Sequence, residues 1–155
     1  MRSNFENLRV YQLAERLADE VWALTASWNT FADDTVGKQI VRAADSVGAN
    51  IAEGTGRGSF QDNRRFVRNA RGSLYETQHW LRQAYRRKLL TAAQVKKIKP
   101  LIEELLPRLN AYLRSIGRIP EPDSSTDRES TGNNRQRIGD GGQRIADSRP
   151  LNSDN

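Results

Sequence analysis

The sequence contains no cysteine and only one histidine, His79, among its 155 residues. Without cysteine the chain cannot form a disulfide or a thiolate zinc site, and this composition fits a reducing compartment. No apolar run reaches the roughly 18 residues of a membrane span, and the first residues lack the apolar centre of a signal peptide. We therefore expect a soluble, cytoplasmic protein that has no membrane partner.

Groups that could perform catalysis are scarce as well. Glu76 and His79 match the Glu-x-x-His pattern of di-iron bundles, but that site needs the pattern twice. Residues 54–59 contain three glycines, yet they lack the Gly-Lys-Ser/Thr ending of a phosphate-binding loop. Glu103 and Glu104 are adjacent, so on a helix they diverge by about 100° and cannot act as an acid–base pair. We expect no enzymatic activity, no metal and no cofactor.

Hydrophobic residues make up 36 % of the chain, which is low for its length, and they are unevenly distributed. Residues 117–155 have almost no large apolar side chains. Such a segment cannot bury enough surface to offset the entropy that is lost on ordering. The sequence thus predicts one folded domain over residues 1–116 and a disordered polar tail over residues 117–155.

Within the predicted domain, apolar side chains recur with the 3.6-residue period of amphipathic helices, and no segment alternates like a strand. We expect four helices, over residues 4–28, 36–53, 60–86 and 92–116. Because four apolar stripes joined by short connections must bury against one another, the predicted fold is all-α, an antiparallel up-down four-helix bundle with a disordered C-terminal tail.

Capping and turn signals support the helix boundaries. The segments from Ser3 to Glu6 and from Thr91 to Gln94 have the pattern of capping boxes, and Ser59 is a further N-cap candidate. The polar residues 29–34 are expected to form a turn. The glycines of residues 54–59 are expected to end a helix, with one of them in the left-handed conformation.

Three further expectations concern single positions. Pro100 and Pro107 lie within one predicted helix, so we expect that helix to bend, or alternatively to break near Pro100. Gly72 in a helix interior costs roughly 1 kcal/mol in helix propensity, for which we expect close helix packing to compensate. Phe66 is expected to face the core.

The helix predicted over residues 60–86 carries five arginines on one side. At about 100° per residue they fall within a strip about 60° wide that is about 33 Å long. Tyr75 and Gln78 share this strip, whereas no Asp or Glu does. A row of like charges favours a polyanionic partner, although an ordinary solvated basic face would have the same pattern. The arginines of the strip are Arg64, Arg68, Arg71, Arg82 and Arg86.

Positive charge is concentrated around this strip. The net charge of the whole chain is +6, but residues 57–99 alone contain twelve Lys or Arg against two Asp or Glu, a net charge of +10. A local excess of this size attracts nucleic acid, an anionic surface or an acidic protein. The other basic residues that we expect to contribute to binding are Arg65, Arg87, Lys96, Lys97 and Lys99.

Three aromatic residues lie beside the predicted apolar stripes rather than within them. Tyr11 and Trp22 lie at the edge of the stripe of residues 4–28, and Trp80 is off-centre on residues 60–86. Aromatic surface next to a core suggests self-association, although residues at the rim of a single bundle would look the same.

Three segments of the chain resemble one known family, the 23S rRNA intervening-sequence proteins, also called four-helix bundle proteins. The opening Asn4–Tyr11 (NFENLRVY), the stretch Ser46–Arg57 (SVGANIAEGTGR) and the stretch Ala70–Thr77 (ARGSLYET) are similar to its motifs. The similar segments occur in the same order over roughly residues 4–116. Pro100 and Pro107 depart from the usual pattern.

This resemblance implies an up-down four-helix bundle that assembles into a homopentameric barrel, with a basic surface suspected of binding nucleic acid and no enzymatic activity. Glu53, Arg57, Arg71 and Glu76 occupy motif positions, so some of them could serve structure through ion pairs. For Arg71, a buried pairing and a contact with the ligand both stay open. Other relatives resemble the accessory variability determinant of diversity-generating retroelements.

Two functions follow as hypotheses. The first is a non-enzymatic, oligomeric nucleic-acid-binding bundle, with RNA favoured over DNA, that holds phosphates through the arginine strip and shows little sequence preference. The alternative is an accessory subunit of a diversity-generating retroelement that docks on a reverse transcriptase and its template RNA.

Overall fold

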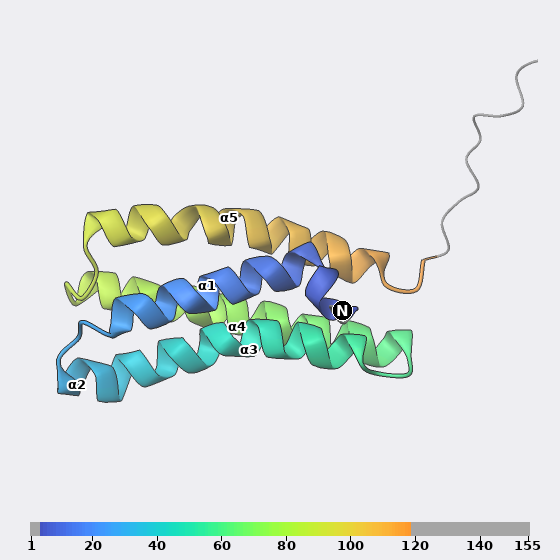
Figure 1. Cartoon of the computed structure of the whole chain (residues 1–155), viewed down its shortest axis with the longest axis horizontal. Coiled ribbons are helices and arrows are strands. Elements are labelled where there is room, and N and C mark those ends of the chain that lie inside the picture. The colour runs from blue at the N-terminus through green and yellow to red at the C-terminus, as the bar shows by residue number, and fades with distance from the viewer. Residues whose placement is uncertain (1–3, 119–155) are drawn as a thin grey trace, which may run out of the picture. The chain divides into compact units, whose positions relative to one another are not determined.

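The computed structural model describes residues 4–118, and these residues form four long helices with short connections. The long helices are α1 (Arg9–Thr25), α3 (Lys38–Thr55), α4 (Phe60–Arg86) and α5 (Ala92–Ser115). Figure 1 shows them running side by side with alternating direction, so that the predicted antiparallel four-helix bundle is confirmed. Around the bundle α1 contacts α3, α3 contacts α4, α4 contacts α5, and α5 contacts α1. The predicted tail lies outside the described residues, apart from Gly117 and Arg118.

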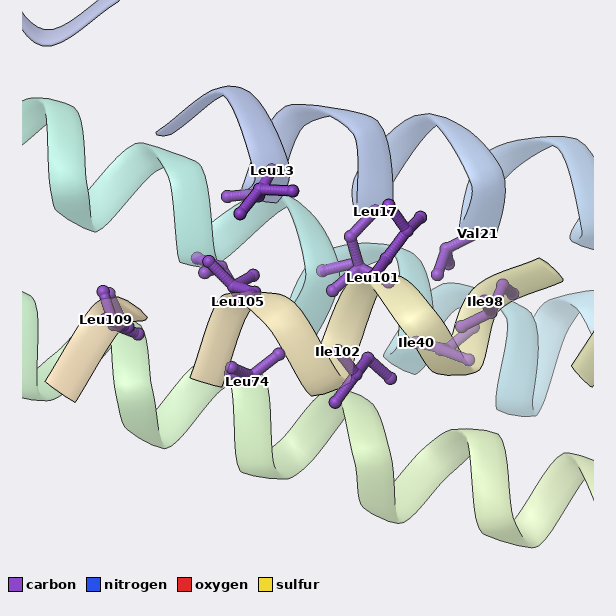
Figure 2. Packing of buried hydrophobic residues seen from close by; sticks show 14 of the residues in the cluster. Leu13, Leu17, Val21, Ile40, Leu74, Ile98, Leu101, Ile102, Leu105 and Leu109 are labelled. Atoms are coloured by element: carbon purple, nitrogen blue, oxygen red, sulfur yellow. The ribbon is translucent and has the colours of Figure 1, made fainter. Parts of the chain in front are cut away.

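The core lies along the axis of the bundle, and all four long helices contribute to it. Figure 2 shows Leu13 and Leu17 of α1, Leu74 of α4 and the side chains of α5 meeting there. Apolar burial of this kind is the main favourable term in folding. The largest side chains that are fully buried are Leu13, Leu17, Ile40, Ile51, Leu74, Leu105 and Leu109.

The sequence placed Phe66 in this core, and this was wrong. Val67 is fully buried instead, whereas Phe66 is half-buried and lies under the guanidinium groups of Arg57 and Arg65, at 4.8 and 5.1 Å from its ring centroid. The two side chains are about 100° apart, one on each side of the apolar stripe, so the pattern alone could not choose between them. Phe66 instead provides a ring face for two cations.

The start of the bundle also differs from the prediction. Residues Phe5–Asn7 form a single 3₁₀ turn, η1, and α1 begins at Arg9 after Leu8, which makes no side-chain cap. Asn4 makes no side-chain cap either, and Ser3 lies outside the described residues. The first helix is therefore shorter than predicted at its N-terminus.

The predicted polar turn at residues 29–34 is largely helical. The Asn29 side chain accepts a hydrogen bond from the Ala32 backbone N–H at 3.0 Å and caps a short helix, α2 (Thr30–Ala32). A π-helical turn, η2 (Asp33–Gly37), continues from it directly into α3. Asp33 and Asp34 lie in the first turn of η2, where negative side chains are favourable. These polar residues therefore start a helix here.

Glycine ends α3 in a different way from the one expected. Gly56, the C-cap of α3, has φ −78°, so it does not adopt the left-handed conformation. The glycine that matters is Gly54, which is buried against α4: a Cβ there would lie 2.7 Å from Asn63 Oδ1 and 3.0 Å from Phe66 Cβ. The absence of a side chain thus permits the close approach of α3 and α4.

The two prolines of α5 leave the helix continuous. Helix α5 runs without interruption from Ala92 to Ser115, so the alternative of a break near Pro100 is wrong. Both Pro100 and Pro107 are exposed. A proline frees the carbonyl four residues before it, and on the solvent side water can bond to that carbonyl.

Two other predicted caps are confirmed, whereas Gly72 lacks the expected packing within residues 4–118. Ser59 Oγ accepts from the Asp62 backbone N–H, and Thr91 with Gln94 forms the full capping box. Gly72 is exposed, and a Cβ added there would meet no atom within 4 Å.

Among residues 4–118, no helix is both long enough and apolar enough to cross a membrane.

Candidate nucleic-acid interface

Helix α4 is the element that positions the arginine strip. Its N-cap, Ser59, places Asp62 in the first turn, and Arg86 lies in the last turn, so both charges suit the helix dipole. Leu74 and Thr77 lie on its buried face, where the Thr77 hydroxyl donates to the Ser73 carbonyl at 2.8 Å. With this face fixed in the core, the direction of every other side chain of α4 follows.

Three arginines of the strip are exposed and unpaired. Arg68, Arg82 and Arg86 are exposed to solvent. Within residues 4–118, none of the three has a carboxylate partner. They extend over 18 residues of α4, or about 27 Å of helix at about 1.5 Å per residue. These three side chains, here called the free arginines, are available for an external anion.

The other two arginines of the strip bind the C-terminal part of α5. Arg64 Nη1 donates to the Ile116 carbonyl at 2.9 Å, and Arg71 Nη1 donates to Asn110 Oδ1 at 3.1 Å. Both side chains are half-buried. For Arg71 the structure thus shows a neutral partner, Asn110, in place of a buried ion pair. Because neutral oxygens do not cancel a charge, Arg64 and Arg71 still add to the positive potential of this face.

The two predicted residues beside the strip behave differently from each other. Arg65 is exposed, but it faces Asp62 at 3.6 Å and lies over the Phe66 ring. Arg87 is exposed and follows the last residue of α4. Sequence reasoning missed its neighbour Lys88, which has φ +60° in the connection to α5. A run of three cations at residues 86–88 was the signal that could have identified it.

The predicted lysines of α5 are mostly engaged. Lys97 bridges to Glu20 of α1 at 3.0 Å, and Lys99 faces Glu103 one turn along α5 at 3.6 Å. Lys96 is exposed and has no ion pair within residues 4–118. Lys96 is thus the best candidate of the three for a ligand contact.

The three aromatic residues predicted at an oligomer interface differ in their exposure to solvent. Trp22 is 68 % exposed, beside a hollow of about 490 Å³ between the end of α1 and the start of α3. Tyr11 is partly buried against the core and meets Phe5 edge-on. Trp80 is also packed on the core, and its indole N–H donates to Glu76 at 3.4 Å. Trp22 alone among the three presents most of its surface to solvent.

Other residues that the sequence analysis singled out make contacts within the bundle. Arg57 forms an ion pair with Glu53 one turn before it and covers Phe66. His79 meets the Trp80 ring edge-on at 5.0 Å between centroids. In the part of the chain that the structure describes, no three His, Cys, Asp or Glu side chains are grouped as metal ligands would be.

Away from the strip, one ion-pair network joins α1 to α5. Glu104 accepts from Arg9 at 2.8 Å and from Arg108 at 3.1 Å. The hydrogen bond from Arg9 lowers the pKa of Glu104, and Arg108 lowers it further. In this network two guanidinium groups share one carboxylate, whereas the free arginines of α4 have no carboxylate partner within residues 4–118.

These features define an antiparallel four-helix bundle with a cationic face on one long helix. The chain belongs to the 23S rRNA-intervening sequence protein family, whose model matches residues 6–111. The fold is similar to the crystal structure, at 1.70 Å resolution, of a protein of unknown function from the S23 ribosomal protein family of Bacteroides thetaiotaomicron. That match has a TM-score of 0.61 and 24 % identity, and it covers 68 % of this chain and 99 % of the other. Among curated proteins, none matches this sequence.

Proposed function

We propose that this protein is a non-enzymatic RNA-binding bundle that works as an oligomer and holds RNA phosphates on the outer face of α4. The observation that carries the proposal is the free arginines, three exposed guanidinium groups on one helix face without carboxylate partners among residues 4–118. Guanidinium groups suit phosphate because their planar donors can bind two oxygens at once. The name of the family to which the chain belongs refers to 23S rRNA.

The test is the salt dependence of RNA binding. Each phosphate contact with a single strand contributes about 0.7 to the slope of log affinity against log salt concentration. Replacing Arg68, Arg82 and Arg86 together with glutamine should therefore make the slope shallower by roughly 2. Arg64 is left intact, because its hydrogen bond to the Ile116 carbonyl connects α4 to the end of α5.

A matched control removes the same charge elsewhere. Arg16 of α1, Arg42 of α3 and Arg114 of α5 are exposed and have no ion pair within residues 4–118. Replacing these three with glutamine should leave the slope unchanged. Equal flattening in both triple variants would show that net charge matters and the α4 face does not. Absence of RNA binding by the unaltered protein would refute the proposed function.

Self-association is the second part of the proposal. Trp22 and the hollow beside it are the support, because a large exposed indole costs free energy in water. The resemblance implies a pentamer, and a ring would repeat the basic face and increase avidity. We expect native mass spectrometry to show an oligomer that Trp22→Gln dissociates. Phe31→Gln is the control, because Phe31 is 79 % exposed but lies in α2.

The accessory-subunit alternative depends on the family resemblance alone. It is separated from the RNA-binding proposal by a pull-down with and without nuclease. A reverse transcriptase that stays bound after nuclease treatment would favour the alternative. Loss of all partners after nuclease treatment would favour RNA as the direct ligand.

A further inference from the structure

A groove lies between the C-terminal half of α4 and the N-terminal half of α5. Its volume is about 470 Å³, which is within the range of clefts that hold small organic ligands. Leu81 and Tyr85 line it from α4, and Ile98 and Ile102 line it from α5. The two isoleucines are buried side chains of the core, labelled in Figure 2, so the groove opens onto apolar surface.

The α4 wall of the groove coincides with the arginine strip. Gln78 and Arg82 belong to the strip, and both line the groove. Arg86 follows Arg82 by one turn of the helix. Tyr85 lies between these two arginines in the sequence and is 58 % exposed. An apolar floor, an exposed aromatic ring and the guanidinium group of Arg82 therefore meet at the groove, and Arg86 lies one turn further along α4.

The opposite wall adds no net charge. Lys99 and Glu103 both line the groove from α5, and they face each other at 3.6 Å. The charge at the groove is thus positive and comes from the α4 side. A ligand that fits must combine a flat, largely apolar part with an anionic part about one helical turn away. An unpaired nucleotide has this chemistry, because its base stacks on aromatic rings and its phosphate binds arginine.

We infer that this groove receives unpaired bases of single-stranded RNA, with the base against Tyr85 and Leu81 and the neighbouring phosphates on Arg82 and Arg86. The inference rests on the proposed function and narrows its substrate class. Bases in a duplex are stacked and paired, and the narrow major groove of A-form RNA does not admit side chains. Double-stranded RNA would reach the arginines but not the groove. The protein should therefore prefer single strands at equal length and salt.

The test measures binding of the full-length protein to two probes by fluorescence anisotropy. One probe is a labelled oligoadenylate single strand, and the other is a mixed-sequence RNA duplex of the same length. Tyr85→Ala should weaken single-strand binding about tenfold, since loss of one stacked base is of this order. It should leave duplex binding and the salt slope unchanged, because no phosphate contact is removed. Tyr85→Phe, which keeps the ring, should retain most of the affinity.

Phe31→Ala is the matched control, because Phe31 is an exposed aromatic residue outside the groove. The inference is overturned if duplex and single strand bind equally well and Tyr85→Ala changes neither. In that case the salt slope of the free arginines would still support the proposed function. The inference about the groove is also overturned if Tyr85→Ala lowers the native mass of the protein, because the groove would then be an interface between copies. Failure of the unaltered protein to bind either probe would instead refute the proposed function.

Discussion

Gly54 of α3 and Gly72 of α4 differ in the room around them, and the same substitution should therefore have opposite effects at the two positions. A Cβ at Gly72 would meet no atom within 4 Å. A Cβ at Gly54 would lie 2.7 Å from Asn63 Oδ1, 3.0 Å from Phe66 Cβ and 3.2 Å from the Asn63 backbone carbonyl. We predict that Gly72→Ala stabilises the bundle and that Gly54→Ala destabilises it.

The magnitudes follow from these surroundings. In an open helix interior, alanine is better than glycine by about 0.5–1 kcal/mol, so Gly72→Ala should raise the free energy of unfolding by that amount. For a bundle of this size the corresponding rise in melting temperature is roughly 4 °C. At Gly54 the new methyl group meets the backbone of α4, which cannot move without shifting the helix. Overpacking of this kind costs about 1–3 kcal/mol, which exceeds the gain in propensity near the end of α3.

The assay is urea denaturation followed by circular dichroism. Protein concentration must be the same for all variants, because association of the chain would add to the apparent stability. Stabilisation or no change in Gly54→Ala would refute the close contact between α3 and α4 at this point. Destabilisation in Gly72→Ala would refute the reasoning from open space, and it would indicate that another molecule packs against Gly72.

Three further predictions concern α5 and its connections. Lys88 has φ +60°, so Lys88→Gly should raise the free energy of unfolding by about 1 kcal/mol in thermal melts, whereas Lys88→Ala should not. Pro107→Ala restores a donor to the Glu103 carbonyl on an exposed face, and it should raise the free energy of unfolding in urea by up to about 3 kcal/mol; no increase would mean that the proline is already accommodated without cost. The pKa of Glu104 is lowered in the folded protein, chiefly by the hydrogen bond from Arg9. As the pH falls, Glu104 is therefore protonated in the unfolded chain before it is protonated in the folded protein. Its stabilisation is complete above the ordinary pKa of 4.5 and is lost as the pH falls through the lowered value, so Arg9→Gln should make stability less dependent on pH there; an unchanged acid limb in urea titrations would contradict this.

Most of the core and the capping box at Thr91 were accessible to sequence reasoning because they depend on local spacing, whereas the capping box expected from Ser3 to Glu6 does not begin α1. Leu13, Leu17, Leu105 and Leu109 follow the helical repeat, and all four are fully buried. The cap at Thr91 likewise needs only residues within one turn. The pattern failed where two neighbouring apolar residues compete for one place, as at residues 66 and 67. At these two residues the position of the adjacent helix decides which side chain is buried.

The candidate site was predictable in part for the same reason. The angular strip of five arginines is a property of α4 alone, and the free arginines Arg68, Arg82 and Arg86 do point to solvent. The partners of Arg64 and Arg71 come from α5, about 40–50 residues further along the chain, and no local pattern contains them. The groove beside Tyr85 also depends on α5, because one of its walls belongs to that helix.

By itself, the sequence determined the four long helices and the apolar face of each one, because apolar residues repeat at spacings of three and four residues. It also determined the concentration of positive charge in residues 57–99, because that is a matter of composition alone. Only the tertiary structure decided which cations are free. Helices α1 and α5 supply the neutralising or anchoring partners, such as Glu20 for Lys97 and the Ile116 carbonyl for Arg64. A charge becomes available to a ligand only when no neighbour in space satisfies it, and neighbours in space are set by how the helices pack.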